Sequence, residues 1–252
     1  MYYAGLDLAY MSQDDGRTWV SMNAPMNRIR LVDPIGTRMY ALGEDSNGGI
    51  AGQVAYTEDN GRSWTEWPAL YELIGGRTPR DLEIEKVAGQ DLIMLTTDSG
   101  PGLAGSWDGG RSWVWLYEED GKYLGAGADA WPKGNATRLI YASSLAGILI
   151  TRDGVDLHNL TNADWRPPTT PPDGPPRSIL ETEDGTFFVV TRAARIFRST
   201  DGGDNWEMVQ DYLTQAAQDM TSSANYAEDG IVMVGTQEGA YWSNDFGDSW
   251  HL

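Results

Sequence analysis

Short runs in which hydrophobic and polar residues alternate recur along the whole chain, and they come in pairs joined by a turn. The pairs are residues 38–42 and 53–56, 92–95 and 102–105, 139–142 and 147–150, 187–191 and 195–198, and 231–235 and 240–242. Alternation with a period of two is typical of strands with one buried face. The pattern therefore predicts a series of β-hairpins with almost no helix, apart from one short turn within residues 212–220.

An eight-residue pattern follows each pair of runs, and we call each copy a repeat turn. It reads Ser/Thr-x-Asp-x-Gly-x-Ser/Thr-Trp, with full copies at residues 12–19, 57–64, 106–113 and 243–250 and a near copy at residues 199–206. A sixth copy, at residues 151–158, keeps Thr151 and Asp153 but has lost the glycine and the tryptophan. The six aspartates stand at positions 14, 59, 108, 153, 201 and 245, in steps of 45, 49, 45, 48 and 44, which is the spacing of repeated supersecondary units.

Each position of the repeat turn suits a tight connection between two strands. The aspartate carboxylate accepts hydrogen bonds from backbone N–H groups further along the chain, and the hydroxyl adds a second local bond. Glycine permits a positive φ, and tryptophan buries a large ring where the next strand begins. We therefore assign a structural role, not a catalytic one, to Ser12, Asp14, Gly16, Trp19, Thr57, Asp59, Gly61, Trp64, Ser106, Asp108, Gly110, Trp113, Thr151, Asp153, Ser199, Asp201, Gly203, Trp206, Ser243, Asp245, Gly247 and Trp250.

The repeat turn resembles the Asp-box, or BNR repeat, of sialidases, sortilin-type receptors, some glycoside hydrolases and photosystem assembly factors, in which it joins the third and fourth strands of a propeller blade. The resemblance implies an all-β fold, a six-bladed β-propeller with Asp-box turns whose N- and C-termini meet at one seam. A length of 252 residues allows 42 residues per blade, which suits four short strands. We expect a single domain over residues 1–252, with approximate blades at 1–26, 27–76, 77–124, 125–172, 173–216 and 217–252.

The first unit is incomplete at its front, because only eleven residues precede its repeat turn. Eleven residues hold two short strands but not three, so blade 1 is predicted to have three strands. Its inner edge is then either blunted by neighbouring residues or completed by a strand from a partner chain. The sequence leaves both alternatives open.

The connections between blades carry aromatic residues, and the resemblance places them on the face opposite the repeat turns. The longest, residues 165–176, is rich in proline. It is either a ligand for an aromatic groove or a stiff strap across blades 4 and 5. Aromatic rings on such connections stack on sugars or anchor protein interfaces, so the partner-binding candidates are Trp67, Tyr71, Tyr123, Trp131 and Trp165.

The composition narrows the classes of partner. With 18 basic and 37 acidic residues the net charge is −19, which repels phosphate backbones and anionic lipids, so we expect neither nucleic acid nor membrane insertion. No cysteine is present, which excludes disulfides and thiolate chemistry. The first residues show no secretory signal pattern, so either the chain is used without Sec export or a leader was removed before residue 1. No segment is apolar enough to cross a bilayer.

The sialidases that the repeat resembles indicate which catalytic groups an enzyme of this kind would need. Those enzymes clamp a substrate carboxylate with three arginines and use a tyrosine nucleophile activated by a glutamate, with an aspartate as acid/base. For an enzyme, the candidates here are Tyr226, Glu228, Arg28, Arg80 and Arg192. Tyr226 and Glu228 would share one face of a strand, but the Arg-Ile-Pro signature of the first clamp arginine is absent.

No zinc, calcium, phosphate or dinucleotide motif is present, so we expect no metal and no cofactor. The function that the sequence favours is a non-catalytic interaction or assembly module that binds a protein or a glycan. The alternative is a sialidase-like glycoside hydrolase. High acidity and the lack of a signal peptide suit a structural component of a bacterial or viral (phage) assembly, and we expect a virion or extracellular assembly rather than the cytoplasm.

Overall fold

The computed structural model of this protein describes residues 2–4, 9–35, 38–45, 52–75, 77–97, 102–118, 125–131, 138–143, 147–214, 216–237 and 239–252. Within these residues, strands that follow one another in the sequence pair antiparallel into six sheets. The first three sheets contain β1 (Tyr2–Ala4), β2 (Ala9–Met11) and β3 (Val20–Met22); β4 (Met26–Ile35), β5 (Arg38–Asp45), β6 (Gly52–Thr57) and β7 (Thr65–Glu66); and β8 (Pro79–Val87), β9 (Gln90–Thr97), β10 (Leu103–Ser106) and β11 (Val114–Tyr117).

The last three sheets have the same consecutive order. They contain β12 (Gly125–Trp131), β13 (Arg138–Ser143), β14 (Gly147–Thr151) and β15 (Trp165–Arg166); β16 (Pro176–Glu181), β17 (Phe187–Thr191), β18 (Ile196–Ser199) and β19 (Glu207–Gln210); and β20 (Ala217–Ser222), β21 (Val232–Thr236) and β22 (Ala240–Ser243). The first sheet has three strands, as predicted. The sixth begins a fourth strand, because an isolated bridge joins Trp242 to His251.

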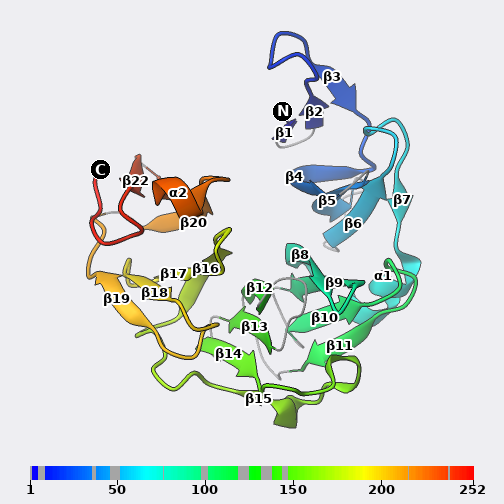
Figure 1. Ribbon diagram of the computed structural model, residues 1–252. Helices are drawn as coiled ribbons and strands as arrows, with labels where there is room; N and C mark the ends of the chain where they lie inside the picture. Colours follow the sequence, from blue (N-terminus) through cyan, green and yellow to red (C-terminus); the bar gives the residue numbers. More distant parts are fainter. Residues whose placement is uncertain are drawn as a thin grey trace.

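The six sheets follow one another around an arc (Figure 1). The first strand of each four-stranded sheet lies toward the inside of the arc, and the last strand lies toward the outside. The marks for the two termini lie on the first and sixth sheets, which are the two ends of the arc. Because neighbouring strands are antiparallel, the first and third connections of a sheet leave from the same end, which we call the turn face.

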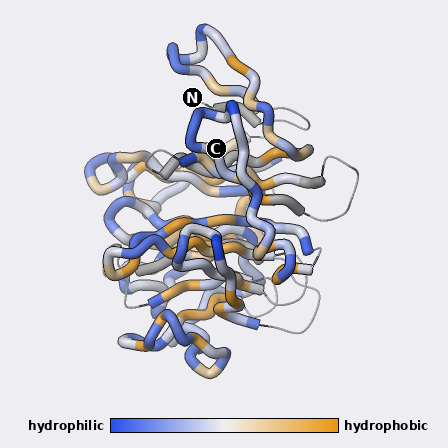
Figure 2. Tube along the Cα trace, turned by 90° about the vertical axis from the view of Figure 1, so that its right-hand side faces the viewer, coloured by the Kyte–Doolittle hydropathy of each residue, from blue (hydrophilic) through white to orange (hydrophobic). Residues whose placement is uncertain are grey.

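Five hydrophobic clusters fill the spaces between successive sheets. One cluster lies between each neighbouring pair, from the first and second sheets to the fifth and sixth. The central strands β9, β13 and β17 are therefore buried on both faces, which explains their continuous apolar runs such as Phe187-Phe188-Val189-Val190. Figure 2 shows hydrophobic residues along the strands in the body of the molecule and mainly hydrophilic residues at the turns on one side.

The sheets at the two ends of the arc differ from the sheets between them. In β21, Val232 and Val234 are buried but Met233 is 40% exposed. In β2, Ala9 and Met11 are buried whereas Tyr10 is partly exposed. Each end sheet therefore packs on one neighbour only, and its other face has no counterpart in the five clusters of the described residues.

Two short helices were not predicted at their positions. Helix α1 (Pro68–Ile74) begins with proline, ends at Gly75 with φ +58°, and buries Leu70 and Ile74, so an expected loop is a packed amphipathic turn. Helix α2 (Tyr226–Asp229) lies between β20 and β21. The predicted helical turn within residues 212–220 is wrong, because residues 217–220 belong to β20.

Candidate functional site

The repeat turn at residues 243–250 shows what the recurring carboxylate does. Ser243 Oγ donates to Asp245 Oδ1 at 2.7 Å and accepts from the Gly247 N–H at 2.9 Å. The N–H and hydroxyl of Ser249 donate to the two carboxylate oxygens of Asp245 at 2.9 and 2.5 Å. The indole Nε1 of Trp250 donates to the Gly247 carbonyl at 3.0 Å. All of these bonds are local, so the carboxylate braces its own turn.

The other complete copies repeat this geometry. The aspartate accepts the backbone N–H four residues ahead at 2.8–2.9 Å in the turns of Asp14, Asp59, Asp108 and Asp201. Hydrogen bonds from Ser63 lower the pKa of Asp59 to about 2, and bonds from Ser249 and Ser243 lower that of Asp245 to about 2. One bond is missing, since the buried Nε1 of Trp64 has no partner among the described residues. These carboxylates are held ionised, and their oxygens already accept hydrogen bonds from their own turns.

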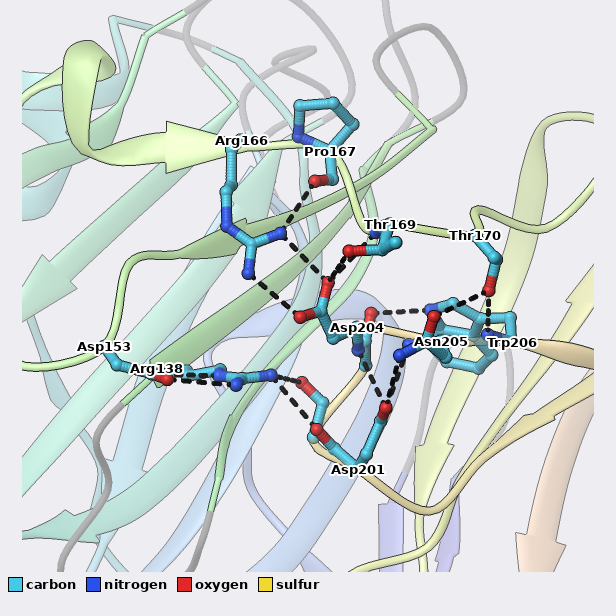
Figure 3. Close-up of polar contacts among 12 residues, drawn as sticks. Arg138, Asp153, Arg166, Pro167, Thr169, Thr170, Asp201, Asp204, Asn205 and Trp206 are labelled. Atoms are coloured by element: carbon cyan, nitrogen blue, oxygen red, sulfur yellow. Dashed lines mark hydrogen bonds and ion pairs between the residues drawn. The ribbon is translucent and has the colours of Figure 1, made fainter.

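The decayed fourth copy is braced differently. Asp153 makes none of the turn bonds described above; it accepts Nε and Nη2 of Arg138 at 2.6 and 3.2 Å (Figure 3). Arg138 is 9% exposed, and its Nη1 donates to the carbonyls of Asp201 and Gly202 at 3.0 and 3.1 Å. The ion pair lowers the pKa of Asp153. The remnant turn of the fourth sheet is thereby tied to the complete turn of the fifth.

The proline-rich segment 165–176, which we call the strap, fastens the same two sheets (Figure 3). Arg166 pairs with Asp204 through two bonds of 3.0 and 3.1 Å, and this pair lowers the pKa of Asp204. Thr169 donates its N–H to the Asp204 carbonyl at 2.8 Å, and the Trp206 N–H donates to the Thr170 carbonyl at 3.1 Å. These contacts favour the strap over the groove-ligand alternative. They also correct the expectation that this connection stays on the opposite face, because it reaches the repeat turn of the fifth sheet.

Trp165 is a structural side chain and not a surface anchor. It is 7% exposed, and its Nε1 donates to the Leu116 carbonyl of the third sheet at 2.8 Å. It lies in the cluster between the third and fourth sheets, where the fourth repeat turn has His158 in place of tryptophan. The His158 ring packs on Trp107 of the third repeat turn, with centroids 4.1 Å apart, but His158 is exposed. Trp165 therefore supplies the buried ring and indole donor that the decayed turn lacks.

Two of the other aromatic candidates are also packed within the fold, and the side chains of the remaining two lie outside the part of the chain that the structure describes. Trp67 is 4% exposed and packs against Tyr40, with ring centroids 5.6 Å apart. The partly buried Tyr71 donates its hydroxyl to the Val54 carbonyl at 3.2 Å. Tyr123 lies outside the described residues, and so does the side chain of Trp131 in β12. The sequence suggested a loop around Trp67 and Tyr71 because it did not reveal helix α1, which directs both side chains toward the protein interior.

Among the described side chains, the candidate catalytic residues do not assemble into a catalytic group. Tyr226 is 1% exposed, lies on α2 rather than a strand, and donates its hydroxyl to the Phe246 carbonyl at 3.2 Å. Burial raises its pKa above the ordinary value, which opposes phenolate formation. Glu228 is exposed, so the two do not share a face. Arg80 lies on β8 of the third sheet and Arg192 in the β17–β18 turn of the fifth; the side chain of Arg28 is outside the described part.

Exposed carboxylates lie on the turn face besides the repeat aspartates, alongside the exposed repeat-turn arginines Arg17, Arg62, Arg111 and Arg152. Asp15 lies in the first repeat turn, Glu183 in the β16–β17 turn, and Glu228 on α2 between β20 and β21. All three are exposed, and no ion pair among the described residues involves them. Sequence reasoning missed this grouping, although Asp15 lies in a repeat turn and Glu183 and Glu228 lie in the first connections of their sheets, which leave from the same end as the repeat turns.

The described part of the chain contains no group of three His, Asp or Glu side chains that would hold a metal ion. None of its helices has both the length and the apolar character needed to span a membrane.

Comparison with solved structures finds propellers over nearly the whole chain. YCF48 bound to D1 peptide is 19% identical at a TM-score of 0.64, and the match covers 99% of this chain and 76% of that chain. The GH74 enzyme of Niastella koreensis is 14% identical at a TM-score of 0.70, covering 98% of this chain and 42% of that one. The WD40 β-propeller domain of Doa1 is 9% identical at 0.65, covering 97% and 74%.

No protein-family model matches the sequence, and no curated protein matches it. Identities this low show the fold alone. Together with the antiparallel sheets of consecutive strands, they establish the architecture: the chain is an all-β propeller.

Proposed function

We propose that this protein is a non-catalytic Asp-box propeller of six blades that binds a protein partner through the turn face. The partner is expected to present a basic surface, because the chain carries a net charge of −19 and opposite charge steers association and fixes orientation. The exposed acids Asp15, Glu183 and Glu228 supply that charge on one face. In YCF48 a related fold is bound to a peptide, which supports the same class of function here.

The observation that carries the proposal is that the repeat-turn carboxylates and the Tyr226 hydroxyl are already hydrogen-bonded within the fold. The five aspartates of the complete turns are occupied by local hydrogen bonds, and Tyr226 is buried with its hydroxyl bonded. A glycosidase needs two carboxyl groups, or a tyrosine and its base, free to reach the substrate. A propeller that binds a partner through an acidic face needs no such free catalytic groups. Such a propeller suits a structural role in a larger assembly.

Binding to peptides of defined charge tests the proposal. The probes are three fluorescent peptides of equal length, one lysine- and arginine-rich, one neutral and one acidic, titrated by anisotropy at two salt concentrations. We expect saturable binding of the basic peptide alone. The variant Glu183→Gln/Glu228→Gln is expected to weaken it about three- to tenfold, as losing two partly screened charge contacts of roughly 0.3–0.7 kcal/mol each implies.

The matched control is Glu72→Gln/Glu118→Gln, which removes the same charge from exposed positions on α1 and on the β11–β12 connection, away from the turn face. Equal loss of affinity in both double variants would show that net charge alone acts, and would refute the turn face as the site. A sialoside and aryl-glycoside panel is run on the same protein. Turnover abolished by Tyr226→Phe would replace the proposal with the glycosidase, and binding of oligosaccharides in place of peptides would make the partner a glycan.

A further inference from the structure

Phe246 occupies the fourth position of the last repeat turn, where the backbone takes a positive φ. In the complete and near-complete copies φ at this position is +56° at Asp15, +59° at Asn60, +74° at Gly109, +73° at Gly202 and +63° at Phe246. Glycine, asparagine and aspartate tolerate this left-handed conformation, whereas a bulky side chain is strained in it. Among the described non-glycine residues with positive φ, only Phe246 is aromatic. The turn itself therefore does not require a phenyl ring.

Core packing does not account for this ring either. The side chain of Phe246 is 41% exposed, and it belongs to none of the five hydrophobic clusters of the described residues. Trp250 of the same turn, by contrast, packs against the cluster between the fifth and sixth sheets. Phe246 thus combines a strained backbone with an exposed ring on the turn face. Strained residues of this kind gather where a protein holds a ligand or partner.

The neighbouring residues hold the ring in one position. Tyr226 meets it edge-on, with ring centroids 5.5 Å apart and ring planes at 81°. A Cβ on Gly230 would lie 2.9 Å from Cδ2 of the ring, so the ring rests directly on the residue that ends α2. The Phe246 carbonyl accepts hydrogen bonds from the Tyr226 hydroxyl at 3.2 Å and from Arg198 Nη1 at 2.7 Å. A ring fixed in this way loses little conformational entropy when a partner covers it.

The two segments that meet at the ring both carry exposed carboxylates. Asp248 lies two residues after Phe246, and its side chain is 68% exposed. The exposed Glu228 lies two residues before Gly230. Arg198 contacts this turn, but its guanidinium is already bonded to the Phe246 carbonyl and to Asp248. The exposed part of the ring therefore lies in a negative environment, which attracts a cation.

An aromatic ring beside a carboxylate already holds an arginine elsewhere in this chain. In the second sheet the guanidinium carbon of Arg38 lies 4.8 Å from the centroid of the Tyr56 ring, and Arg38 Nε bonds Glu58 Oε1 at 2.6 Å. A planar guanidinium can stack on a ring while its N–H groups bond a carboxylate, and a lysine ammonium lacks this geometry. Among the described residues a cation lies over the rings of Tyr56 and Trp115 only. Phe246 offers the same ring and carboxylates with its exposed area uncovered.

We propose that Phe246 is the aromatic anchor of the turn face and receives an arginine side chain of the partner, stacked on the ring between the acids of the two segments. The inference rests on the proposed function, because it specifies the chemistry of the basic partner. The partner then carries an arginine at the contact and not merely a positive charge. Aromatic and arginine side chains are also the residue types that dominate the energetics of protein interfaces.

Two peptides of equal length and charge test the inference, one with arginine and one with lysine at every cationic position, titrated by fluorescence anisotropy. We expect the wild-type protein to bind the arginine peptide more tightly. Phe246→Leu keeps an apolar side chain but removes the ring, so it should weaken binding of the arginine peptide about two- to fivefold and abolish the preference. Phe246→Trp should strengthen the preference, because indole is the best ring for a cation.

Two further variants separate binding from stability. Phe246→Asn places the residue of the second repeat turn at this position, and it should abolish the preference without lowering the Tm, because relief of the strained φ offsets the lost contact with Tyr226. The matched control is Tyr212→Asn, which removes an exposed ring from the β19–β20 connection on the opposite face and should leave the preference intact.

The inference is overturned if the wild-type protein binds both peptides equally, or if Phe246→Leu keeps the arginine preference. The proposed function survives either result as long as both peptides bind and lose affinity in Glu183→Gln/Glu228→Gln. Failure of both peptides to bind the wild-type protein would refute the proposed function and the anchor together.

Discussion

Arg138 offers a quantitative test of how the propeller tolerates a decayed repeat. Its guanidinium is 9% exposed, makes two bonds to Asp153, and donates to the carbonyls of Asp201 and Gly202 in the next sheet. Replacement by methionine keeps most of the aliphatic stem and removes all four bonds. The change therefore isolates the polar link between the fourth and fifth sheets.

The two parts of this link contribute unequally. The Asp153 side chain is 63% exposed, so its pairing with Arg138 behaves like a surface ion pair and contributes about 0–1 kcal/mol. The two carbonyls are contacted by a buried charged donor, and such bonds contribute about 1.5–3 kcal/mol each before losses are shared. Arg138→Met should therefore cost about 2–4 kcal/mol, whereas Asp153→Asn should cost less than about 1 kcal/mol.

Thermal and denaturant unfolding of the variants measures these costs. For a chain of this size Arg138→Met should lower the Tm by roughly 4–16 °C. Arg152→Met is the control, because Arg152 is exposed and its loss should stay within about 0.5 kcal/mol. If Arg138→Met is no more destabilising than Asp153→Asn, the carbonyl bonds do not hold the sheets together and the reasoning fails.

Three further predictions follow from the turns and their packing. Gly110→Ala should lower the free energy of unfolding by about 1–3 kcal/mol in denaturant, because φ is +87° and the new Cβ would lie 2.2 Å from the Trp67 ring. Gly154→Ala is the control and should cost less, because its φ is +73° but the space around it is open. Trp165→Phe should lose about 1–3 kcal/mol, since the Leu116 carbonyl loses its 2.8 Å indole donor; an unchanged Tm would contradict this. The pKa of Asp245 is lowered to about 2 in the fold, so its stabilisation is present above the unfolded pKa of about 4 and disappears as pH falls toward 2. Asp245→Asn should flatten stability over that range, and an unaltered acid profile would count against the bracing role.

Local chemistry made the strands and turns predictable. A pattern such as Ser243-x-Asp245-x-Gly247 specifies its bonds within five residues, so no distant contact is needed to infer it. The runs expected to form strands at residues 92–95, 139–142 and 187–191 lie within β9, β13 and β17. The alternation predicts one buried face for every strand; β21 agrees with this prediction, whereas β17 is buried on both faces.

What the sequence could not show depends on partners that are distant in the chain. The burial of Trp165 requires the Leu116 carbonyl, 49 residues away. The strap contacts Asp204 and Trp206 across 35 or more residues. Tyr226 looked like a strand residue because alternation cannot distinguish a strand from the single turn of α2, which ends at Gly230 with φ +61°.

The fourth sheet shows why loss of a repeat signature need not mean loss of a blade. A repeat turn performs two separable tasks, since its carboxylate closes the hairpin and its tryptophan packs on the preceding sheet. In the fourth unit the second task passes to Trp165, which reaches the third sheet, while Arg138 adds a link forward to the fifth. Packing selects ring volume and a donor in the right place, not the position of the ring in the chain.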